Sequence, residues 1–334
     1  TVQNALPDFQ KDLGLKVNHS NLCSEITLAT NEERTAVCCL SSVNLENFDE
    51  WQDNEFFIPD LVRFLDNVIT YFIDNAPDAL SRAKYSAERE RSIGLGAMGF
   101  HAYLQKKNIA FESMFAQSTN YTMFRHIKEQ AQFETEELAK ERGSCPDDKT
   151  NRVRNAHLLA VAPNASSSII CGNTSPSIEP YRANAFTQKT KTGSSLLKNK
   201  YLEQLLSKKG RSTPEIWKSI ITNHGSVQHL DFLNDHEKAM FATAVEIDQR
   251  WVVNLAAERQ EFICQSQSCN IFFPADVSKQ ELHNVHMMAW KKGMKTLYYL
   301  RSEAIKRADN VSDKKLREYI FDYSDEEGCL ACEG

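Results

Sequence analysis

The sequence predicts an α/β fold built from parallel strand–helix units. From residue 91 onward, short apolar segments of strand type alternate with amphipathic segments of helical period, a pattern typical of parallel βα units. Before that point, apolar residues recur at helical spacing through residues 56–75, which indicates a first amphipathic helix. An ordinary (β/α)8 barrel is one arrangement that this pattern permits.

The individual elements follow from local patterns along the chain. Residues 1–18 show no strong period, and helices are expected where apolar residues recur three or four positions apart: 56–75, 97–106, 123–142, 195–209, 213–223, 236–260 and 279–292. Short apolar runs predict strands at 91–95, 158–163, 268–273 and 296–300. Residues 308–334 are acidic and weakly periodic, so we expect a mobile tail after a folded unit of residues 1–307.

Composition restricts the class of protein. The chain has 334 residues, of which 41% are hydrophobic and 25% charged, ordinary values for a globular protein. A net charge of −6 argues against non-specific nucleic-acid binding, and no apolar run is long enough to span a membrane. Nine cysteines in a chain of this length do not suggest a disulfide scaffold and favour a reducing, cytoplasmic compartment.

Residues 19–26 carry an unusual row of polar side chains. In an extended segment, Asn21, Cys23 and Glu25 would face the same way, as would His19. An amide, a thiol and a carboxyl in one row are costly to bury without a purpose. Glu25 would raise the pKa of the Cys23 thiol, which disfavours a thiolate nucleophile.

Three interpretations of that row remain open on these residues alone. A neutral thiol could work by hydrogen-atom transfer, with the Glu25 carboxyl as a general base. His19 could instead pair with Cys23 as in a thiol hydrolase. The third interpretation is a strand of mixed polarity with a buried, inert cysteine.

Residues 94–99 match the pattern G-x-G-x-x-G after an expected strand and before an expected helix. This is the dinucleotide fingerprint, which needs a ribose-binding acid about twenty residues further on, at the end of a second strand. Glu112 is the nearest candidate, but no convincing strand ends there. A tight strand-to-helix turn is therefore favoured over a nucleotide-binding module.

Residues 163–168 follow an apolar segment and include three serines. If a helix begins in the serines, its backbone N–H groups and hydroxyls would form an anion site. The alternative is a serine that only caps the helix.

Two further pairs lie near the end of the chain. Tyr298 and Tyr299 are in a strand-like segment, where one ring in the core and one at the surface is the ordinary arrangement. Cys329 and Cys332 form a C-x-x-C pair. A second pair or a close pair of histidines is missing from the sequence around it, so a redox dithiol is favoured over a zinc site and we assign no metal ligand.

The chain resembles one enzyme family over nearly its whole length, from about residue 20 onward. Residues 20–26, followed by residues 38–45, resemble the active-site finger loop and the following strand of the large, catalytic subunit of class I ribonucleotide reductase. Further segments resemble that family in the same order: residues 91–100, 162–168, 246–251, 265–268 and 295–299.

This resemblance implies a fold and an activity. The family fold is a ten-stranded α/β barrel made of two antiparallel halves, with the finger loop threading its centre. Residues 1–307 would be the second barrel half with the finger loop, and residues 308–334 a flexible, redox-active tail. The implied activity is the thiyl-radical reduction of ribonucleoside diphosphates to deoxyribonucleotides for DNA synthesis.

The resemblance also implies a role for each residue of the finger loop. A radical on Cys23 would abstract a hydrogen atom from the ribose, Glu25 would take a proton from a ribose hydroxyl, and Asn21 would hydrogen-bond the substrate. Cys38 would be one of two thiols that reduce the sugar and become a disulfide, with its neighbour Cys39 as the second choice.

Other segments would bind the substrate and pass electrons. The family uses the Tyr298–Tyr299 pair to pass a radical to the active-site thiol, and a tail pair such as Cys329 and Cys332 to reduce the active site again. The substrate-binding set implied for this chain is Ser20, Asn21, Glu25, Pro163, Asn164, Ala165, Ser166 and Ser167. Family members often carry a polar residue at the position of Ala165, so only its backbone is assigned.

The resemblance implies partners and no cofactor bound by this chain. The radical would come from the metal site of a small subunit, and thioredoxin or glutaredoxin would be the reductant. The second sugar-reducing thiol of the family lies upstream of the finger loop, but the twenty-two residues before Cys23 contain no cysteine, and the chain begins with Thr1. We therefore expect a split-gene subunit of phage type or a piece cut from a longer chain, which binds a separate N-terminal part of the large subunit.

Overall fold

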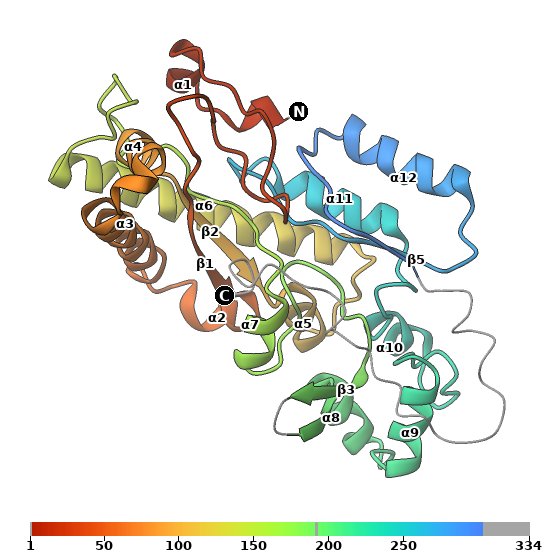
Figure 1. Ribbon diagram of the computed structural model, residues 1–334. Coiled ribbons are helices and arrows are strands. Elements are labelled where there is room, and N and C mark those ends of the chain that lie inside the picture. The colour runs from red at the N-terminus through yellow and green to blue at the C-terminus, as the bar shows by residue number, and fades with distance from the viewer. Residues whose placement is uncertain (1, 191–192, 303–334) are drawn as a thin grey trace.

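The computed structural model describes residues 2–190 and 193–302 (Figure 1). Cys329, Cys332 and the expected boundary between residues 307 and 308 lie outside the described residues, so the predicted tail stays a prediction. None of the helices in the described part is both long and apolar enough to cross a membrane.

A parallel pair of strands forms the centre of the fold. β1 (Cys39–Asn44) pairs in parallel with β2 (Ile93–Met98), in a register that runs from Cys39 opposite Ile93 to Asn44 opposite Met98. Every residue of β2 is buried, as is typical of a parallel strand covered on both faces. Gly96 allows the close approach of the next segment, because a Cβ there would lie 2.5 Å from the carbonyl oxygen of Ala160.

The parallel series continues beyond β2 in chain order. Leu95 forms a parallel bridge to Leu159, and Val161 forms one to Gln267. Shortly after Gln267, β5 (Ile271–Phe273) pairs in parallel with β6 (Leu300–Ser302). This order of parallel segments, with helices between them, confirms the α/β prediction and fits one half of a barrel.

Helices cover this series of strands (Figure 1). The main ones are α3 (Phe57–Asn75), α4 (Ser81–Glu90), α5 (Phe100–Lys106), α6 (Met114–Arg142), α11 (Gln249–Arg259) and α12 (Lys279–Lys291). α3 buries a stripe at helical spacing, namely Ile58, Val62, Leu65 and Ile69. These four residues belong to one large hydrophobic core together with side chains of β1, β2, α6 and α11.

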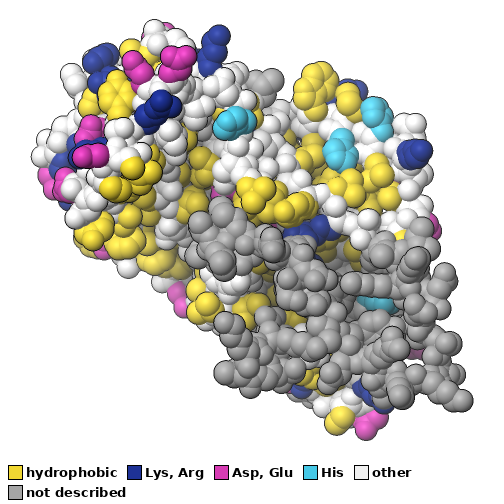
Figure 2. All heavy atoms as spheres, viewed as in Figure 1, with side chains coloured by type: hydrophobic (Ala, Val, Ile, Leu, Met, Phe, Trp, Pro, Cys, Tyr) yellow, Lys and Arg dark blue, Asp and Glu magenta, His cyan; other side chains and the backbone are white. Residues whose placement is uncertain are grey.

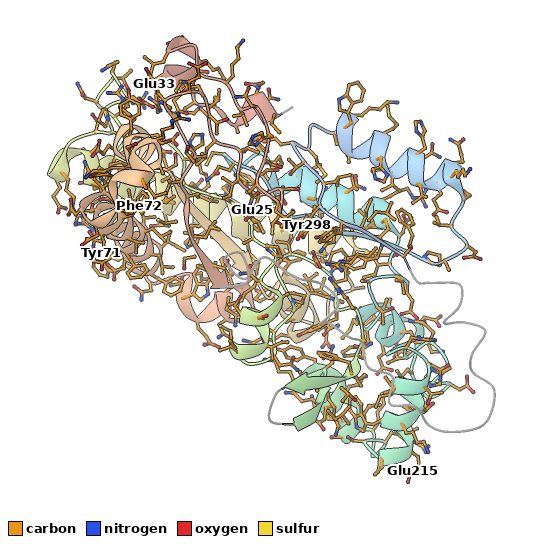
Figure 3. All side chains as sticks on the ribbon, in the orientation of Figure 1. Glu25, Glu33, Tyr71, Phe72, Glu215 and Tyr298 are labelled. Carbon is orange, nitrogen blue, oxygen red and sulfur yellow. The ribbon has the colours of Figure 1, made fainter. Side chains whose placement is uncertain are left out.

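α3 also exposes hydrophobic side chains on its outer face. Phe64 and Tyr71 are 59% and 71% exposed, and Figure 3 shows Tyr71 at the outer edge of the helix. In the space-filling view, hydrophobic side chains gather on the side of the molecule where α3 lies (Figure 2). This helix is therefore apolar on more than its core-facing stripe.

A smaller group of elements has its own hydrophobic core. It comprises the antiparallel hairpin β3 (Ala185–Thr190) and β4 (Gly193–Lys198) with α8 (Lys200–Lys208), α9 (Pro214–Thr222) and α10 (Asp235–Met240). The buried residues of this core include Leu202, Leu206, Trp217, Ile220 and Phe241. The remaining elements are short: η1 (Val2–Ala5), α1 (Asp8–Asp12), η2 (Leu45–Asn47), α2 (Phe48–Trp51), η3 (Asp78–Leu80) and α7 (Ala165–Ile170).

Two helix predictions are wrong in part. The expected helix 236–260 is divided, because α10 ends at Met240 and a new helix, α11, begins after Asp248, whose side chain accepts a hydrogen bond from the Arg250 N–H. The expected helix 195–209 begins only at Lys200, capped by the Asn199 side chain, since residues 193–198 form β4. Side-chain caps of this kind satisfy the free N–H groups of a first turn and fix where a helix begins.

The other elements agree in type and differ in their ends. α6 begins at Met114 instead of residue 123, because the Ser113 side chain caps the helix there. β2 runs on to Met98, so α5 begins at Phe100 after a turn at Gly99, whose φ is 83°. Residues 158–163 form isolated bridges and no regular strand. β5 is shorter than the expected strand 268–273, and β6 begins only at Leu300, the last residue of the expected strand 296–300. Residues 1–18 contain two short helices.

Candidate active site

The segment with the predicted polar row folds into a tight turn. The Asn21 N–H donates to the carbonyl oxygen of Ile26 at 3.3 Å, and the Asn21 Oδ1 accepts from the Ile26 N–H at 3.1 Å. Ser24 has a φ of 71°, in the left-handed region. The premise of an extended segment is therefore wrong, because an asparagine side chain that bonds the backbone favours a turn over a strand.

The turn nevertheless buries the thiol and the carboxyl together. Cys23 is 3% exposed and Glu25 is fully buried, while Leu22 between them is 63% exposed. His19 is exposed, and its Nδ1 lies 3.3 Å from the carbonyl oxygen of Ser20. This position of His19 gives no support to a Cys23–His19 pair.

Tyr298 and Tyr299 lead from the surface to the thiol. The phenol O–H of Tyr298 donates to the Cys23 Sγ at 3.5 Å, and the two tyrosine rings lie 4.1 Å apart between centroids at an angle of 38°. Tyr299 is 43% exposed. Burial and then the contact with Cys23 raise the pKa of Tyr298, so its phenol stays protonated.

The two oxygens of Glu25 have different surroundings. Oε2 accepts a hydrogen bond from the Ser268 hydroxyl at 3.0 Å. Oε1 is buried and makes no hydrogen bond of normal geometry to a described residue, although the Asn21 side chain lies close enough to lower the pKa of the carboxyl. Burial raises the pKa of this carboxyl. Figure 3 shows Glu25 and Tyr298 close together at the centre of the molecule.

Cys38 and Cys39 differ in what they contact. The Gln265 Nε2 donates to the Cys38 Sγ at 3.4 Å, whereas Cys39 packs against the large hydrophobic core. Burial raises the pKa of both thiols. Since Ser268 also contacts Glu25, Cys38 is the thiol connected to the site through residues 265–268.

The segment 163–168 begins a short helix beside β1. The N-cap of α7 is Asn164, at a φ of 53°, and its side chain does not cap the helix. Instead its Oδ1 accepts from the Ser42 hydroxyl on β1 at 3.1 Å, and its Nδ2 lies 3.4 Å from the Ser167 Oγ. Ser166 is exposed, and Pro163, Ala165 and Ser167 are half-buried. A serine N-cap is therefore wrong, and the first turn of α7 stays accessible.

The glycines of residues 94–99 serve the packing of the strands. A Cβ at Gly94 would lie 2.4 Å from the Leu40 Cδ2, and one at Gly96 would meet the Ala160 carbonyl oxygen. Protein atoms therefore pack directly against the backbone at both glycines. Gly99 supplies the turn before α5 with its positive φ. These contacts favour the tight-turn interpretation of this motif.

Sequence reasoning assigned no role to several polar residues of the site. Gln265 and Ser268 are fully buried, and Thr296 donates to the carbonyl oxygen of Ser24 at 2.8 Å. The signals in the sequence were the run of polar residues 265–268 directly before an expected strand and the resemblance of residues 265–268 and 295–299 to segments of the family. Such a run must have hydrogen-bond partners if it is buried, but the sequence does not identify them.

Comparison with known proteins decides the family. The family model described as "Ribonucleotide reductase, barrel domain" matches residues 4–153 and 147–300. The chain belongs to this family. The predicted family and its barrel fold are thereby confirmed.

Individual members of the ribonucleotide reductase family are similar over most of the chain. The ribonucleoside-diphosphate reductase large subunit of Invertebrate iridescent virus 6 is 51% identical over 298 residues, which are 88% of this chain and 31% of that protein. The large subunit of Invertebrate iridescent virus 3 is 47% identical over 337 residues, covering 100% of this chain and 53% of that protein. The chain thus spans about a third to about half of these relatives.

A solved ribonucleotide reductase structure has the same fold. The Actinobacillus ureae class Id ribonucleotide reductase alpha subunit superposes with a TM-score of 0.85 and 41% sequence identity, over 91% of this chain and 56% of that chain. At this identity the likeness extends beyond the fold to the sequence.

Proposed function

We propose that this chain is the catalytic portion of a ribonucleoside-diphosphate reductase large subunit, which reduces ribonucleotides through a thiyl radical on Cys23. The observation that carries the proposal is the contact between the Tyr298 phenol and the Cys23 thiol, with the ring of Tyr299 next to that of Tyr298 and partly exposed. A hydrogen atom can pass from the thiol to a tyrosyl radical across such a contact. The raised pKa of Tyr298 keeps its phenol protonated, and Cys23 is buried beside it, an arrangement that suits hydrogen-atom transfer.

Glu25 acts as the general base on the ribose. Its buried Oε1 makes no hydrogen bond of normal geometry to a described residue, and a ribose hydroxyl would satisfy it. The raised pKa of Glu25 makes this carboxylate a stronger base than an exposed one, which suits proton abstraction near neutral pH. The thiyl radical on Cys23 takes one hydrogen atom from the ribose and returns one at the end of the cycle.

Cys38 supplies half of the reducing equivalents. Replacing a ribose hydroxyl by hydrogen consumes two electrons and two protons, and the hydroxyl leaves as water. Two thiols provide these when they close a disulfide. Cys38, in contact with Gln265, is one of them, and the other belongs to the N-terminal part of the large subunit.

The remaining groups bind the substrate. Asn21 and Ser20 hydrogen-bond the nucleoside, and residues 163–167 hold its phosphates. The accessible first turn of α7 and the Asn164 link to β1 support the phosphate role, since backbone N–H groups and hydroxyls bind anions. The substrate is a ribonucleoside diphosphate, as the names of the viral relatives state for those proteins.

The partners follow from the same chemistry. A small subunit with a metal site supplies the radical to Tyr299, and the N-terminal part of the large subunit completes the barrel. Thioredoxin or glutaredoxin regenerates the active-site thiols through Cys329 and Cys332. Cys38, Cys39, Cys145, Cys171, Cys264 and Cys269 are free in the described part of the chain, which supports a reducing compartment, the cytoplasm.

The test is reconstitution with a point variant. The chain is combined with the N-terminal part and the small subunit, and deoxyribonucleotide formation is measured for wild type, Cys23→Ser and the exposed Cys171→Ser as control. The Cys23→Ser variant should bind substrate but form no deoxyribonucleotide, because a serine O–H bond is too strong to carry the radical. The Cys171→Ser variant should form deoxyribonucleotide like wild type. Near-normal reduction by Cys23→Ser contradicts the proposal, and rapid alkylation of Cys23 at low pH would instead indicate a thiol hydrolase.

A further inference from the structure

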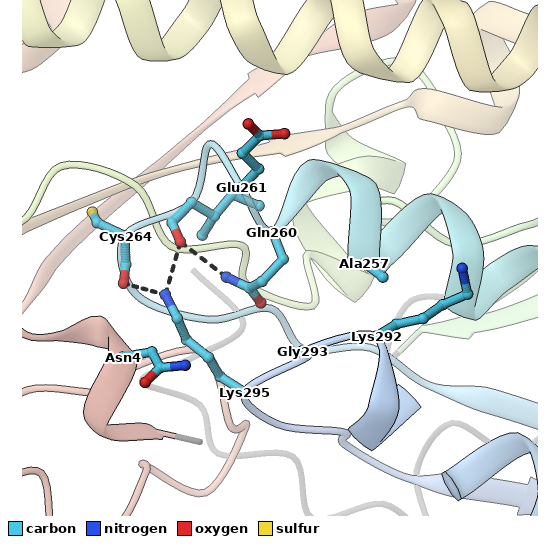
Figure 4. Close-up of a pocket in the computed structure, with 9 residues that line it drawn as sticks. Asn4, Ala257, Gln260, Glu261, Cys264, Lys292, Gly293 and Lys295 are labelled. Atoms are coloured by element: carbon cyan, nitrogen blue, oxygen red, sulfur yellow. Dashed lines mark hydrogen bonds between the residues drawn. The ribbon is translucent and has the colours of Figure 1, made fainter. Parts of the chain in front are cut away.

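A lysine outside the proposed catalytic set holds the loop that connects the site's functional groups. The Lys295 Nζ donates to the carbonyl oxygens of Ile263, Cys264 and Gln265, at 3.0, 2.5 and 2.7 Å. An ammonium group has three N–H bonds, and these three carbonyls use all of them. Figure 4 shows the Lys295 side chain reaching the carbonyl oxygen of Cys264, with a dashed line marking the hydrogen bond.

The same loop contacts the functional groups from its other side. We call residues 263–268 the bridging loop. Its Gln265 side chain donates to the Cys38 Sγ at 3.4 Å and to the Ile93 carbonyl oxygen at 3.0 Å. Its Ser268 hydroxyl lies 2.5 Å from the Cys23 carbonyl oxygen and 3.0 Å from the Glu25 Oε2. One loop thus touches two groups that the proposed reaction uses, the Cys38 thiol and the Glu25 carboxyl, together with the backbone of Cys23.

We propose that Lys295 is a positioning residue for the proposed reaction, which fixes the bridging loop so that Gln265 and Ser268 orient the Cys38 thiol and the Glu25 carboxyl. This inference rests on the proposed function. Carbonyl oxygens that converge on one point repel each other unless a cation lies between them. Without Lys295 the three carbonyls separate, and Gln265 and Ser268 move with them.

The effect of this movement falls on the rate of the chemical step. A displacement of about 1 Å in a catalytic group can cost about 10²-fold in rate. Lys295 contacts backbone carbonyls and none of the groups to which we assign substrate binding. Its loss should therefore lower kcat on the order of 10- to 100-fold and leave KM nearly unchanged.

An open hollow beside Lys295 makes the inference testable by chemical rescue. The hollow has a volume of about 390 Å³ and is lined by Lys295 together with Asn4, Gln260, Glu261, Lys292 and Gly293. A small ammonium ion can therefore reach the carbonyls from solvent when the lysine side chain is removed. Propylammonium matches the atoms that Lys295→Ala removes, and tetramethylammonium has the charge but no N–H donor.

The experiment uses the assembled enzyme with deoxyribonucleotide formation as readout. Lys295→Ala should lower kcat, propylammonium should restore it in a saturable manner, and tetramethylammonium should not. Lys292→Ala is the matched control, since Lys292 is an exposed lysine of the same hollow and should keep full activity. Full activity of Lys295→Ala, or a loss that propylammonium does not restore, overturns the inference.

A second variant covers the case in which Lys295→Ala does not fold. Gln265→Leu keeps the lysine and removes the amide that contacts Cys38. It should lower kcat to a similar extent, without rescue by propylammonium, and an unchanged kcat overturns the inference. A wild-type assembly that forms no deoxyribonucleotide would instead refute the proposed function, so the two failures are distinguishable.

Discussion

At the scale of single residues, the site depends on a carboxyl with one bonded and one unbonded oxygen. Glu25 accepts from Ser268 through Oε2, and its Oε1 is buried and makes no hydrogen bond of normal geometry in the described part of the chain. Burying a carboxylate in this way disfavours its charged form. The carboxyl is therefore held ready to accept a proton, and its ionisation should control the acid side of the pH profile.

Glu25→Gln should bind substrate and lose about 10²–10⁴-fold in rate, the usual contribution of a general base. Because burial raises the pKa of Glu25, kcat/KM should fall with decreasing pH at a higher pH than for an ordinary glutamate. Ser268→Ala removes a hydrogen bond that lowers this pKa, so its acid limb should lie higher still. The measurement is kcat/KM against pH. If the fall in kcat/KM occurs at a lower pH in Ser268→Ala than in wild type, Glu25 is not the general base.

Tyr298→Phe and Tyr299→Phe should each stop turnover without unfolding the chain. Each removes one hydroxyl, at a cost in stability of about 1 kcal/mol or less, but phenylalanine cannot carry the radical. Activity is measured beside a thermal melting curve. Tyr71→Phe, on the exposed face of α3, is the control that should retain activity. If each variant loses activity only in proportion to a lower melting temperature, the two tyrosines have a structural role and do not carry a radical.

The residues of the site were predictable only in part. The alternation of residues 21–25 predicted that Cys23 and Glu25 face the same way in an extended segment; both are buried, but the backbone is a turn. The Tyr298 contact with Cys23 joins residues 275 positions apart, and the local pattern around the tyrosines does not contain it. Lys295 was missed for the same reason, since its partners are backbone carbonyls that any sequence would present.

At the scale of elements, β2 depends on glycines that bring three segments close together. A Cβ at Gly96 would lie 2.5 Å from the Ala160 carbonyl oxygen, 3.2 Å from the Ser42 Oγ and 3.3 Å from the Val161 Cα. The nearest atom is backbone, which cannot rotate away as a side chain can. The glycine is therefore a requirement of the strand packing.

Gly96→Ala should lower the free energy of unfolding by about 1–3 kcal/mol, the typical cost of overpacking a core. Gly210→Ala is the control, because nothing lies within 4 Å of its Cβ position and only its φ of 65° is unfavourable, at a cost of about 1 kcal/mol. Urea denaturation measures both. Gly96 itself lies in β2 without a positive φ, so an unchanged free energy of unfolding in Gly96→Ala would show that the contact with Ala160 is not a constraint.

Elements with a clear period were predictable, and elements fixed by capping or pairing were not. The stripe of α3 is continuous, so its ends were placed within one residue. The division between α10 and α11 depends on the Asp248 cap, while apolar residues continue through the break. β3 and β4 pair with each other, but the serines, threonines and lysines of residues 185–198 do not alternate with apolar residues.

At the scale of the whole molecule, a buried polar cluster ties the N-terminal segment to the fold. Gln10 of α1 donates to Glu90 at 3.0 Å and to Asp147 at 3.2 Å. Asp147 in turn pairs with Arg34 at 2.6 Å, and Glu90 accepts from Ser86. Four distant parts of the chain therefore meet at two buried carboxyls.

Stability should depend on pH through Glu90. Burial raises the pKa of Glu90 from 4.5 to about 7, so between these values the folded state binds more protons than the unfolded state, and stability falls as pH rises through this window. The total loss is about 3 kcal/mol. The stability of Glu90→Gln relative to wild type should therefore improve from pH 5 to pH 8 in urea titrations. An equal difference at both pH values contradicts this prediction.

The tight turn at Cys23 has a consequence for the order in which the protein folds. Its side-chain partners lie 243 to 275 positions later in the chain: Ser268, Thr296 and Tyr298. Contacts of such sequence separation form slowly, and during synthesis the later residues emerge tens of seconds after the turn at about 5–20 residues per second. The Cys23 thiol should thus be among the last groups to leave solvent, and pulsed alkylation during refolding should find Cys23 reactive after Cys145 is protected. Earlier protection of Cys23 would contradict this order. If the order is correct, the Cys23 thiol is enclosed only after residues 268–298 have been made.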